Sequence, residues 1–329
     1  MSRDLYIKAN ASAKEWVRPS DWLSMPTNIT SADQIFVGLH AVFESGQNYC
    51  AFSFTTSAGQ YKVDWGDGTV TLHNSNTIAQ KNYDYASISN STICSRGYKQ
   101  VIIKVTPVSG NLLTCNFQQR FVTTPAQNQA YSSGFLECIL SMPNASSGGS
   151  IIFGGVTIIR HAYCEKVDIK TIGNATSMVN MFYNCTSLQS VPLFNTQNVT
   201  NMDSMFRNCS SLQSVPLFNT QNVTNMQQMF VSCFSLNFIP NFNTALVTNF
   251  TNFANGCSSL DRCTTIFRNS VGLQNCQLSK DALVEIFTNL IDRTSTTSAT
   301  IDITGNWGAT ALTSADRLIA TNKNWTITG

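Results

Sequence analysis

The sequence predicts a β-rich α+β protein: a β-sandwich, then a solenoid in which each 24-residue repeat supplies a short strand and a short helix, then an α/β cap. The main observation is a repeated segment, SLQSVPLFNTQNVTNM, at residues 187–202 and again at residues 211–226. Cysteines recur in phase with it, whereas residues 34–110 show short alternating stretches without a helical period. Tight internal repetition is typical of stacked units.

The composition limits the class of partner. Asp, Glu, Lys and Arg make up 12% of the 329 residues, about half of the usual ~25%, and the net charge is +2. Because no long basic run occurs, we expect no nucleic-acid partner. The N-terminus lacks an apolar segment, and no stretch of 18 apolar residues occurs, so we expect neither a secretion signal nor a membrane span. A neutral surface rich in hydroxyl and amide groups suits a structural or carbohydrate-facing protein.

Residues 1–33 lack both the sandwich and the repeat pattern and are predicted to form an N-terminal docking arm. Trp16 and Trp22 lie on either side of Arg18 and Pro19. Trp16, Arg18 and Trp22 are therefore the candidates for attachment to a larger assembly. The alternative is an arm that folds back onto its own sandwich, and the sequence leaves the two near even.

Residues 34–110 are predicted to form short β-strands. They include YKVDWGDGTVTL at residues 61–72 and YKQVIIKVTPV at residues 98–108. The V-D-W-G-D-G-T motif resembles that of a PKD-like domain, which implies an immunoglobulin-type β-sandwich.

The motif also raises the question of a cation site. Gly66 and Gly68 suit a turn with positive φ, and Trp65 is expected in the core. Asp64 and Asp67 could bind a cation, but calcium takes six or more oxygen ligands and no acidic cluster lies near them in the sequence. We favour carboxylates that cap the turn and predict no metal site.

Each repeat, here called a coil, is predicted to hold a short helix before its cysteine. Apolar residues at i, i+3, i+4 and i+7 share one helical face. Thr200 and Asp203, like Thr224 and Gln227, have the spacing of a capping box. Because the cysteines recur in phase, we interpret them as packed, reduced thiols. The apolar sets are Met178, Met181, Phe182 and Cys185, then Met202, Met205, Phe206 and Cys209, then Met226, Met229, Phe230 and Cys233.

A short strand is predicted after each cysteine. Pro192, Pro216 and Pro240 lie inside these strands, which must therefore be short or only partly paired. One coil cannot bury enough apolar surface to fold alone, so the coils must stack. The apolar strand positions are Leu188, Val191 and Leu193, then Leu212, Val215 and Leu217. The candidate binding face consists of Gln189, Ser190, Gln213, Ser214 and Asn237.

The coil sequence VTNMDSMFRNCSSLQSVPLFNT resembles the BspA-like leucine-rich repeat, in the variant M-x-x-M-F-x-x-C-x-S-L. The resemblance places a leucine-rich-repeat solenoid at residues 160–268, and it implies a strand face used for contact or adhesion. Residues 111–159 are expected to form degenerate first coils or a connection.

Residues 269–329 are predicted to form the C-terminal cap that a solenoid needs. Residues 279–292 have the pattern of an amphipathic helix, residues 299–304 that of a strand, and Thr313 to Asp316 open another helix. WTITG closes the chain as a strand, and its Ile327 follows Ile303 by 24 residues. The apolar face of the first helix consists of Leu283, Ile286, Phe287 and Leu290.

We expect a protein without catalytic, cofactor-binding or metal-binding residues. His40, His73 and His161 occur in unrelated sequence contexts, and no C-x-x-C pair, phosphate loop or paired-acid motif is present. We therefore expect that the chain is not an enzyme.

The order of arm, sandwich and repeats resembles structural proteins of tailed bacteriophages. The resemblance implies a virion location, as a capsid decoration, head fibre or tail-associated adhesin. The N-terminal part would attach to other capsid or tail proteins, and the repeats would contact a host surface protein or polysaccharide. Homo-oligomers are expected because virion appendages follow particle symmetry.

Two alternatives remain. The first is a bacterial cell-surface adhesin, the usual setting of BspA-like repeats, which would need an export or sorting signal. The second and less favoured is a tail glycan depolymerase, which would need paired carboxylates on the repeat face, where this sequence has Gln, Ser and Pro.

Overall fold

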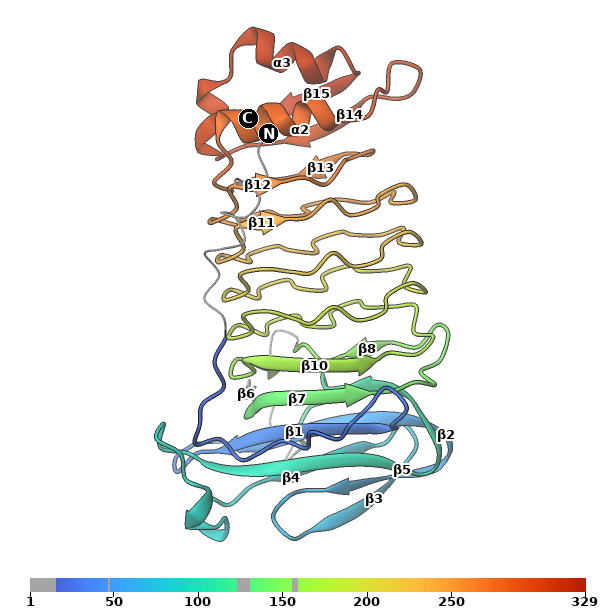
Figure 1. Ribbon diagram of the computed structural model, residues 1–329, viewed down its shortest axis with the longest axis vertical. Helices are drawn as coiled ribbons and strands as arrows, with labels where there is room; N and C mark the ends of the chain where they lie inside the picture. Colours follow the sequence, from blue (N-terminus) through green and yellow to red (C-terminus); the bar gives the residue numbers. More distant parts are fainter. Residues whose placement is uncertain (1–15, 47, 123–130, 156–158) are drawn as a thin grey trace. The chain divides into compact units, whose positions relative to one another are not determined.

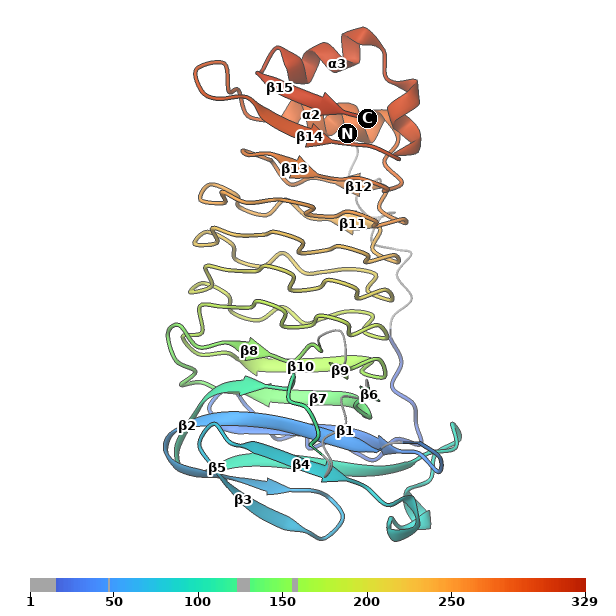
Figure 2. The same cartoon turned by 180° about the vertical axis from the view of Figure 1, so that it is seen from behind.

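The protein is rich in β-strand. Its described residues form mixed sheets with few helices, which confirms the predicted β-rich class (Figures 1 and 2). They divide into two compact units, residues 17–188 and, together with Trp16, residues 189–329. The computed structural model describes residues 16–46, 48–122, 131–155 and 159–329.

The first unit is built on one eight-stranded sheet. Its strands are β1 (Ile35–Val42), β2 (Tyr49–Asp64), β3 (Val70–Asn74), β4 (Ile78–Asn82), β5 (Lys99–Asn116), β7 (Phe135–Ser141), β8 (Ile151–Ile152) and β10 (Lys166–Thr171). The strand order is β10-β7-β1-β5-β2-β3, with β4 also paired to β2 and β8 to β5. The pairs among β1, β2, β5 and β7 are antiparallel, whereas β10 runs parallel to β7.

Shorter elements complete this unit. Two-residue strands β6 (Tyr131–Ser132) and β9 (Ile159–Arg160) form a separate parallel pair. Two 3₁₀ turns, η1 (Tyr85–Ser87) and η2 (Asn90–Thr92), precede β5.

Aromatic rings form the core of the first unit. Phe52 and Phe54 occupy alternate positions of β2, so both point to the same face of the sheet. The ring of Phe36 lies 5.6 Å from that of Phe135. Gly38 makes room for this packing, since a Cβ there would stand 2.4 Å from a ring carbon of Phe135. The fully buried rings include Phe36, Phe52, Phe54, Phe117, Phe135 and Phe153, and each of these phenylalanines contributes about 1.5–3 kcal/mol by burial.

The sequence had separated residues 34–110 from the coils that follow, but strands from later segments continue the same sheet. Val37 of β1 pairs with Ile139 of β7, and Ile139 pairs in turn with Asp168 of β10. This arrangement satisfies the backbone groups that an isolated edge of β1 would leave unpaired. The strands of residues 35–116 therefore belong to one extended sheet.

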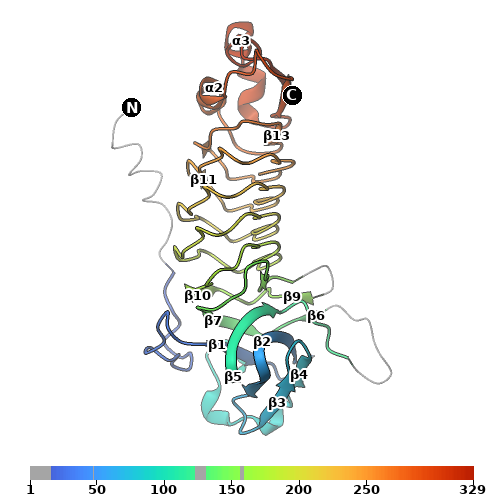
Figure 3. The same ribbon diagram turned by 90° about the vertical axis from the view of Figure 1, so that its right-hand side faces the viewer.

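The coils of the second unit lie one beside the next (Figure 3). Backbone hydrogen bonds join successive coils. Asn201, Asn225 and Asn249 form parallel bridges from one coil to the next. Alternate N–H groups donate across the same boundary: Met202 to Asn225, Ser204 to Gln227, Phe206 to Met229 and Asn208 to Val231, all at 2.8–3.0 Å. The pattern repeats from Met226 to Asn249, Gln228 to Thr251, Phe230 to Phe253 and Ser232 to Asn255.

The prediction of a short helix in each coil is wrong. Residues 202–209 and 226–233 form successive turns. Ser204 and Asn208 have φ of 54° and 62°, and Gln228 and Ser232 have φ of 53° and 58°. A left-handed residue at every fourth position ends each right-handed turn before a helix can form.

The predicted capping boxes are absent for the same reason. Thr224 instead donates its backbone N–H to the carbonyl of Thr200, at 2.8 Å, in the preceding coil. The turns are held by asparagine: Oδ1 of Asn201 accepts from the N–H of Asp203, and Oδ1 of Asn225 accepts from the N–H of Gln227, both at 3.0 Å.

The strands predicted after Cys185 and Cys209 do not form, although the extended segments there still bond from coil to coil. Gln213 donates its N–H to the carbonyl of Gln189 at 2.9 Å, and Pro216 has no N–H to continue the ladder. Farther along, β11 (Phe238–Ile239) pairs in parallel with β12 (Arg262–Cys263).

The structure confirms the two helices and two strands predicted for the C-terminal region, which are α2 (Lys280–Asn289), β14 (Ala299–Asp302), α3 (Ser314–Thr321) and β15 (Trp325–Thr328). It adds β13 (Val271–Gly272) and a 3₁₀ turn η3 (Trp307–Ala311), which the sequence does not predict. Thr313 and Asp316 form the expected capping box. Strands β13, β14 and β15 are parallel, but Ile327 pairs with Ile301 rather than with Ile303, the residue 24 positions earlier.

Two histidines are fully enclosed in the first unit. Nε2 of His40 accepts from the backbone N–H of Gly134 at 3.0 Å, and Nδ1 of His161 lies 2.5 Å from Oγ of Ser133. Burial lowers the pKa of His40 to about 3, helped by the charge of His161, and burial lowers the pKa of His161 to about 4. Both rings are therefore neutral in the folded protein near neutral pH. Besides His161, the titratable side chain that packs against His40 is Tyr83, with ring centroids 5.3 Å apart.

We expect the first unit to lose stability as the pH falls below about 6.5, the ordinary pKa of histidine. Each of the two histidines takes up a proton on unfolding in this range but not in the folded state, so each removes about 1.4 kcal/mol per pH unit. Urea unfolding at pH 7.5, 6.0 and 5.0 should show a falling midpoint. The variant His161→Gln should show a shallower decline. His73→Gln should change the decline less, because burial lowers the pKa of His73 as well but its site is partly exposed. A midpoint that is flat from pH 7.5 to 5.0 would contradict this account.

Candidate binding surfaces

The second unit exposes side chains in columns that run from coil to coil. In residues 193–197 and 217–221, exposed and buried residues alternate, as in an extended strand. Leu193 is 65% exposed and Leu217 60%, although the sequence had placed both in the apolar interior. The exposed columns are Leu193, Leu217 and Asn241, then Asn195, Asn219 and Asn243, then Gln197, Gln221 and Ala245.

These columns carry no charge. Between residues 189 and 260 the sequence has two charged residues, Asp203 and Arg207, and both lie in the turn segment before Cys209. The exposed face therefore offers amide groups beside leucine side chains. Such a face suits an uncharged ligand, because no desolvated charge has to be compensated.

Buried threonines hold the columns in place. Thr196 donates from Oγ1 to the carbonyl of Asn219, and Thr220 donates to the carbonyl of Asn243, both at 2.8 Å. The neighbouring Phe194 and Phe218 are buried, with ring centroids 5.2 Å apart. The exposed residues therefore alternate with buried side chains that pack against, or bond to, the next coil.

The outward asparagines close local turns. Oδ1 of Asn195 accepts from the N–H of Gln197 at 3.0 Å, and Oδ1 of Asn219 accepts from the N–H of Gln221 at 3.2 Å. This bond holds the side-chain amide in one orientation, with its NH₂ group available to solvent or a ligand.

The face predicted from the sequence lies elsewhere. Its residues, Gln189, Ser190, Gln213, Ser214 and Asn237, are all half-buried. The carbonyl of Asn237 accepts from the N–H of Asp261 at 3.1 Å, so part of this face serves the coil-to-coil bonding. The sequence signal for the exposed columns is the alternation in L-F-N-T-Q. Its first, third and fifth residues point outward, and its second and fourth residues are buried.

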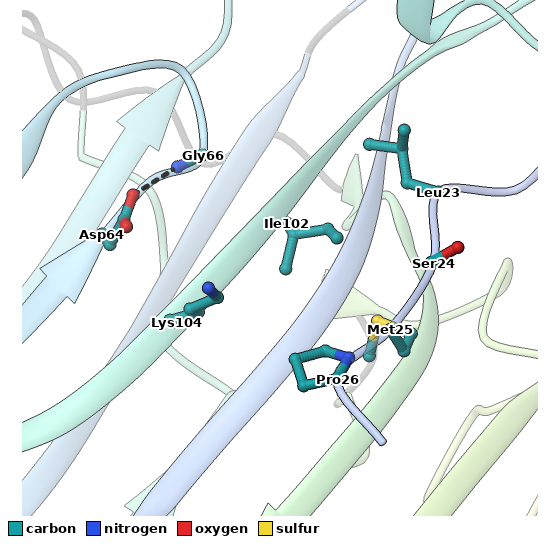
Figure 4. Close-up of a pocket in the computed structure, with 8 residues that line it drawn as sticks. All are labelled: Leu23, Ser24, Met25, Pro26, Asp64, Gly66, Ile102 and Lys104. Atoms are coloured by element: carbon teal, nitrogen blue, oxygen red, sulfur yellow. Dashed lines mark hydrogen bonds between the residues drawn. The ribbon is translucent and has the colours of Figure 1, made fainter. Parts of the chain in front are cut away.

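The first unit has an open cleft of about 390 Å³ on the sheet (Figure 4). Ile102 and Lys104 of β5 form its base, and Asp64 at the end of β2 lies beside Lys104 in register. The N-terminal segment forms the opposite wall. The lining residues are Leu23, Ser24, Met25, Pro26, Asp64, Gly66, Ile102 and Lys104.

The two aspartates of the W-G-D-G turn act as turn caps. Oδ1 of Asp64 accepts from the N–H of Gly66, and Oδ1 of Asp67 accepts from the N–H of Thr69, both at 3.0 Å. Burial alone would raise the pKa of Asp67, but hydrogen bonds and the charge of Lys81 lower it. Gly66 has φ of 76°, and a Cβ there would stand 2.5 Å from the carbonyl of Ile102. Within the described residues, no group of three His, Cys, Asp or Glu side chains could hold a metal ion.

The candidate docking residues are occupied within the protein. Trp22 is 4% exposed, and its Nε1 donates to the hydroxyl of Tyr98 at 3.0 Å. Arg18 donates to Oε2 of Glu137 at 2.7 Å and to the carbonyl of Leu23 at 2.5 Å.

The segment that contains Arg18 and Trp22 also covers part of the sheet. Ile29 packs against Val37 and Ile139, with Met25 and Ile102 beside them. These contacts match the alternative of an arm folded back on its own sheet. Trp16 is half-buried, and the rest of the predicted arm lies outside the described residues.

All eleven cysteines are buried free thiols, as their spacing predicts. In the second unit they also bond between coils. Sγ of Cys233 donates to the carbonyl of Phe206 at 3.0 Å, and Sγ of Cys257 donates to the carbonyl of Phe230 at 2.9 Å. Burial raises the pKa of both thiols, which suppresses thiolate chemistry.

Comparison with known proteins gives a family match for part of the chain. Residues 160–271 match the family described as Mycoplasma protein of unknown function, DUF285, which links this stretch to BspA-like repeats. No curated protein and no solved structure matches the chain. None of the described helices is long and apolar enough to cross a membrane.

Replacing Thr220 by valine should destabilise the second unit by about 1–3 kcal/mol, because the buried threonine loses its hydrogen bond to the carbonyl of Asn243 while the side chain keeps its shape. Thr248→Val is the matched control, since its exposed hydroxyl donates to Thr224 at 3.2 Å. The control should lose a few tenths of a kcal/mol, about the effect of an exposed site. Urea unfolding of both variants measures the difference, and equal losses would refute the role of the buried hydroxyl.

Proposed function

We propose that the chain is a non-enzymatic structural and binding protein on the surface of a bacteriophage particle. In this proposal the coils form a leucine-rich-repeat solenoid of the BspA-like type, and residues 34–110 form a PKD-like module. The match of residues 160–271 to a family linked to BspA-like repeats supports the first assignment. The W-G-D-G turn with its two aspartate caps supports the second.

One observation carries the binding role: the uncharged columns of Leu193, Asn195 and Gln197 and their counterparts in the next coils. Their backbone is fixed by bonds from coil to coil, so the exposed groups are presented at a regular spacing close to the 4.7–4.9 Å of neighbouring strands. A rigid, repeated surface loses little conformational entropy when it binds. The ligand class that fits is a host surface protein or polysaccharide with an uncharged contact face.

The attachment role falls to the first unit in this proposal. Its open cleft beside Asp64 and Lys104 is a place where another virion protein of the capsid or tail could be received. Arg18 and Trp22 would serve this role indirectly, because they hold the cleft wall of residues 23–26 on the sheet.

The second candidate is an adhesin on a bacterial cell surface. The observation that favours it is the match to a family of Mycoplasma proteins. Both proposals use the same columns of the repeat, and they differ in where the protein resides.

Mass spectrometry of purified phage particles decides between the two locations. We expect peptides of this chain in particles at a constant ratio to the major capsid protein after repeated density-gradient purification. A non-structural phage protein from the same lysate serves as the control and should be lost. If this chain is lost as well, the virion location is wrong, and labelling of intact bacteria would then test the surface location.

The double variant Leu193→Glu with Leu217→Glu should reduce attachment of particles to host cells at least tenfold, because it places charges on the uncharged columns. Leu246→Glu is the matched control: this leucine is also exposed, at 53%, but lies outside the columns. All three positions are solvent-exposed, so folding should be retained and thermal unfolding will verify this. Equal attachment by wild type, double variant and control would exclude the columns as the binding face.

A further inference from the structure

Strand β3 is an unprotected edge of the eight-stranded sheet. It is the last strand in the order and pairs with β2 alone within the part of the chain that the structure describes. Figures 1 and 2 show it at the margin of its sheet. Four of its five residues are exposed, and the fifth, His73, is half-exposed.

The sequence of β3 contains none of the features that usually prevent edge pairing. Edge strands are commonly protected by charged residues, proline or a bulge. VTLHN has neither charge nor proline, and its register with β2 is continuous from Val70 to Asn74. Val70 and Leu72, which point to the same face, are 56% and 55% exposed. Such a strand presents a row of unpaired backbone groups beside exposed apolar side chains.

We propose that β3 pairs with β3 of a second copy of this chain, antiparallel and around a two-fold axis at Thr71. This register places Val70 opposite the partner's Leu72, and Leu72 opposite the partner's Val70. Both apolar residues become covered by each other, which opposite positions on antiparallel strands allow at a Cβ separation of about 4.5–5.5 Å. An interface of this kind is closed, because the same patch serves both copies.

The charges that flank β3 fit the same axis. On β2, Asp64 lies in register with Val70, and Lys62 lies in register with Leu72. In the dimer, each row of side chains across the two sheets therefore runs from Asp64 through Val70 and the partner's Leu72 to the partner's Lys62. Every row has opposite charges at its two ends and apolar side chains between them. The surface is thus complementary to itself in charge and in polarity.

This self-complementarity favours a second copy of the chain as the partner of β3. A strand of an unrelated protein would need to supply the same alternation, whereas a second copy supplies it by symmetry. The inference does not depend on the location or ligand proposed above, because it uses only the sheet of the first unit.

Analytical ultracentrifugation of the full chain over a range of concentrations tests the proposal. We expect wild-type protein to reach twice the mass of one chain, and Leu72→Lys to weaken this dimer at least tenfold. Val108→Lys is the control, because Val108 has the same 55% exposure but lies on β5, which is separated from β3 by β2. Val108→Lys should dimerise like the wild type. A wild-type protein that remains monomeric at the highest concentration, or a Leu72→Lys variant that dimerises normally, overturns the proposal.

A cysteine placed at the axis tests the register. Thr71→Cys should form a disulfide-linked dimer under mild oxidation, since a two-fold axis brings this position next to the partner's Thr71. The native cysteines are all buried and should not react. Asn74→Cys, at the other end of the strand, is the control and should stay monomeric on a denaturing gel. A crosslink at position 74 but not at position 71 overturns the register.

Discussion

Backbone groups of each coil form hydrogen bonds with the neighbouring coils, and the structure of the second unit depends on this constraint. The turns before Cys209 and Cys233 direct alternate N–H groups along the stack, so each turn segment donates four hydrogen bonds to the next coil. Thr196 and Thr220 add side-chain bonds in the same direction. The thiols of Cys233 and Cys257 donate in the opposite direction, to carbonyls of the preceding coil. Since a buried polar group without a partner is costly, a coil is stable only beside its neighbour.

The first unit satisfies its backbone by a different route. Its sheet recruits β7 and β10 from chain segments well beyond the first strands, and residues 17–33 cover part of one face. Buried phenylalanines, with Tyr61 and Trp65, fill the interior. The result is a sheet whose two margins differ: the β10 margin is built from the segment in which the repeats begin, and the β3 margin is left open.

The sequence predicted the C-terminal elements well because their local signals agree. Residues 280–289 combine a serine cap with an apolar face, and Thr313 with Asp316 marks the start of the next helix. The coil helices were mispredicted because two consecutive turns space their buried residues as a helix does. Asn208 and Gly256 are the residues in the sequence that argue against a helix, since both residue types favour positive φ.

The candidate surface was harder to derive. Leu193 and Leu217 are apolar and recur in phase, which favours an interior position, and only the alternation with Phe194 and Phe218 reveals that they point outward. Trp22 shows the opposite error: it is predicted to dock onto another protein, but it is buried against its own sheet. In both cases the residue type alone was ambiguous, and the direction of the side chain depended on the strand beside it.

The constant register between coils has a consequence for how the chain can change length. Oγ1 of Thr224 donates to Thr200, and Oγ1 of Thr248 donates to Thr224, in each case across 24 residues. A gene segment that encodes one whole repeat can therefore be duplicated or lost by recombination, because the new neighbours find donors and acceptors in the same places. A gain or loss of a single codon has no such neutral outcome, since it shifts every later bond in that coil. The copied sixteen-residue segment at 187–202 and 211–226 fits such a history of whole-repeat exchange.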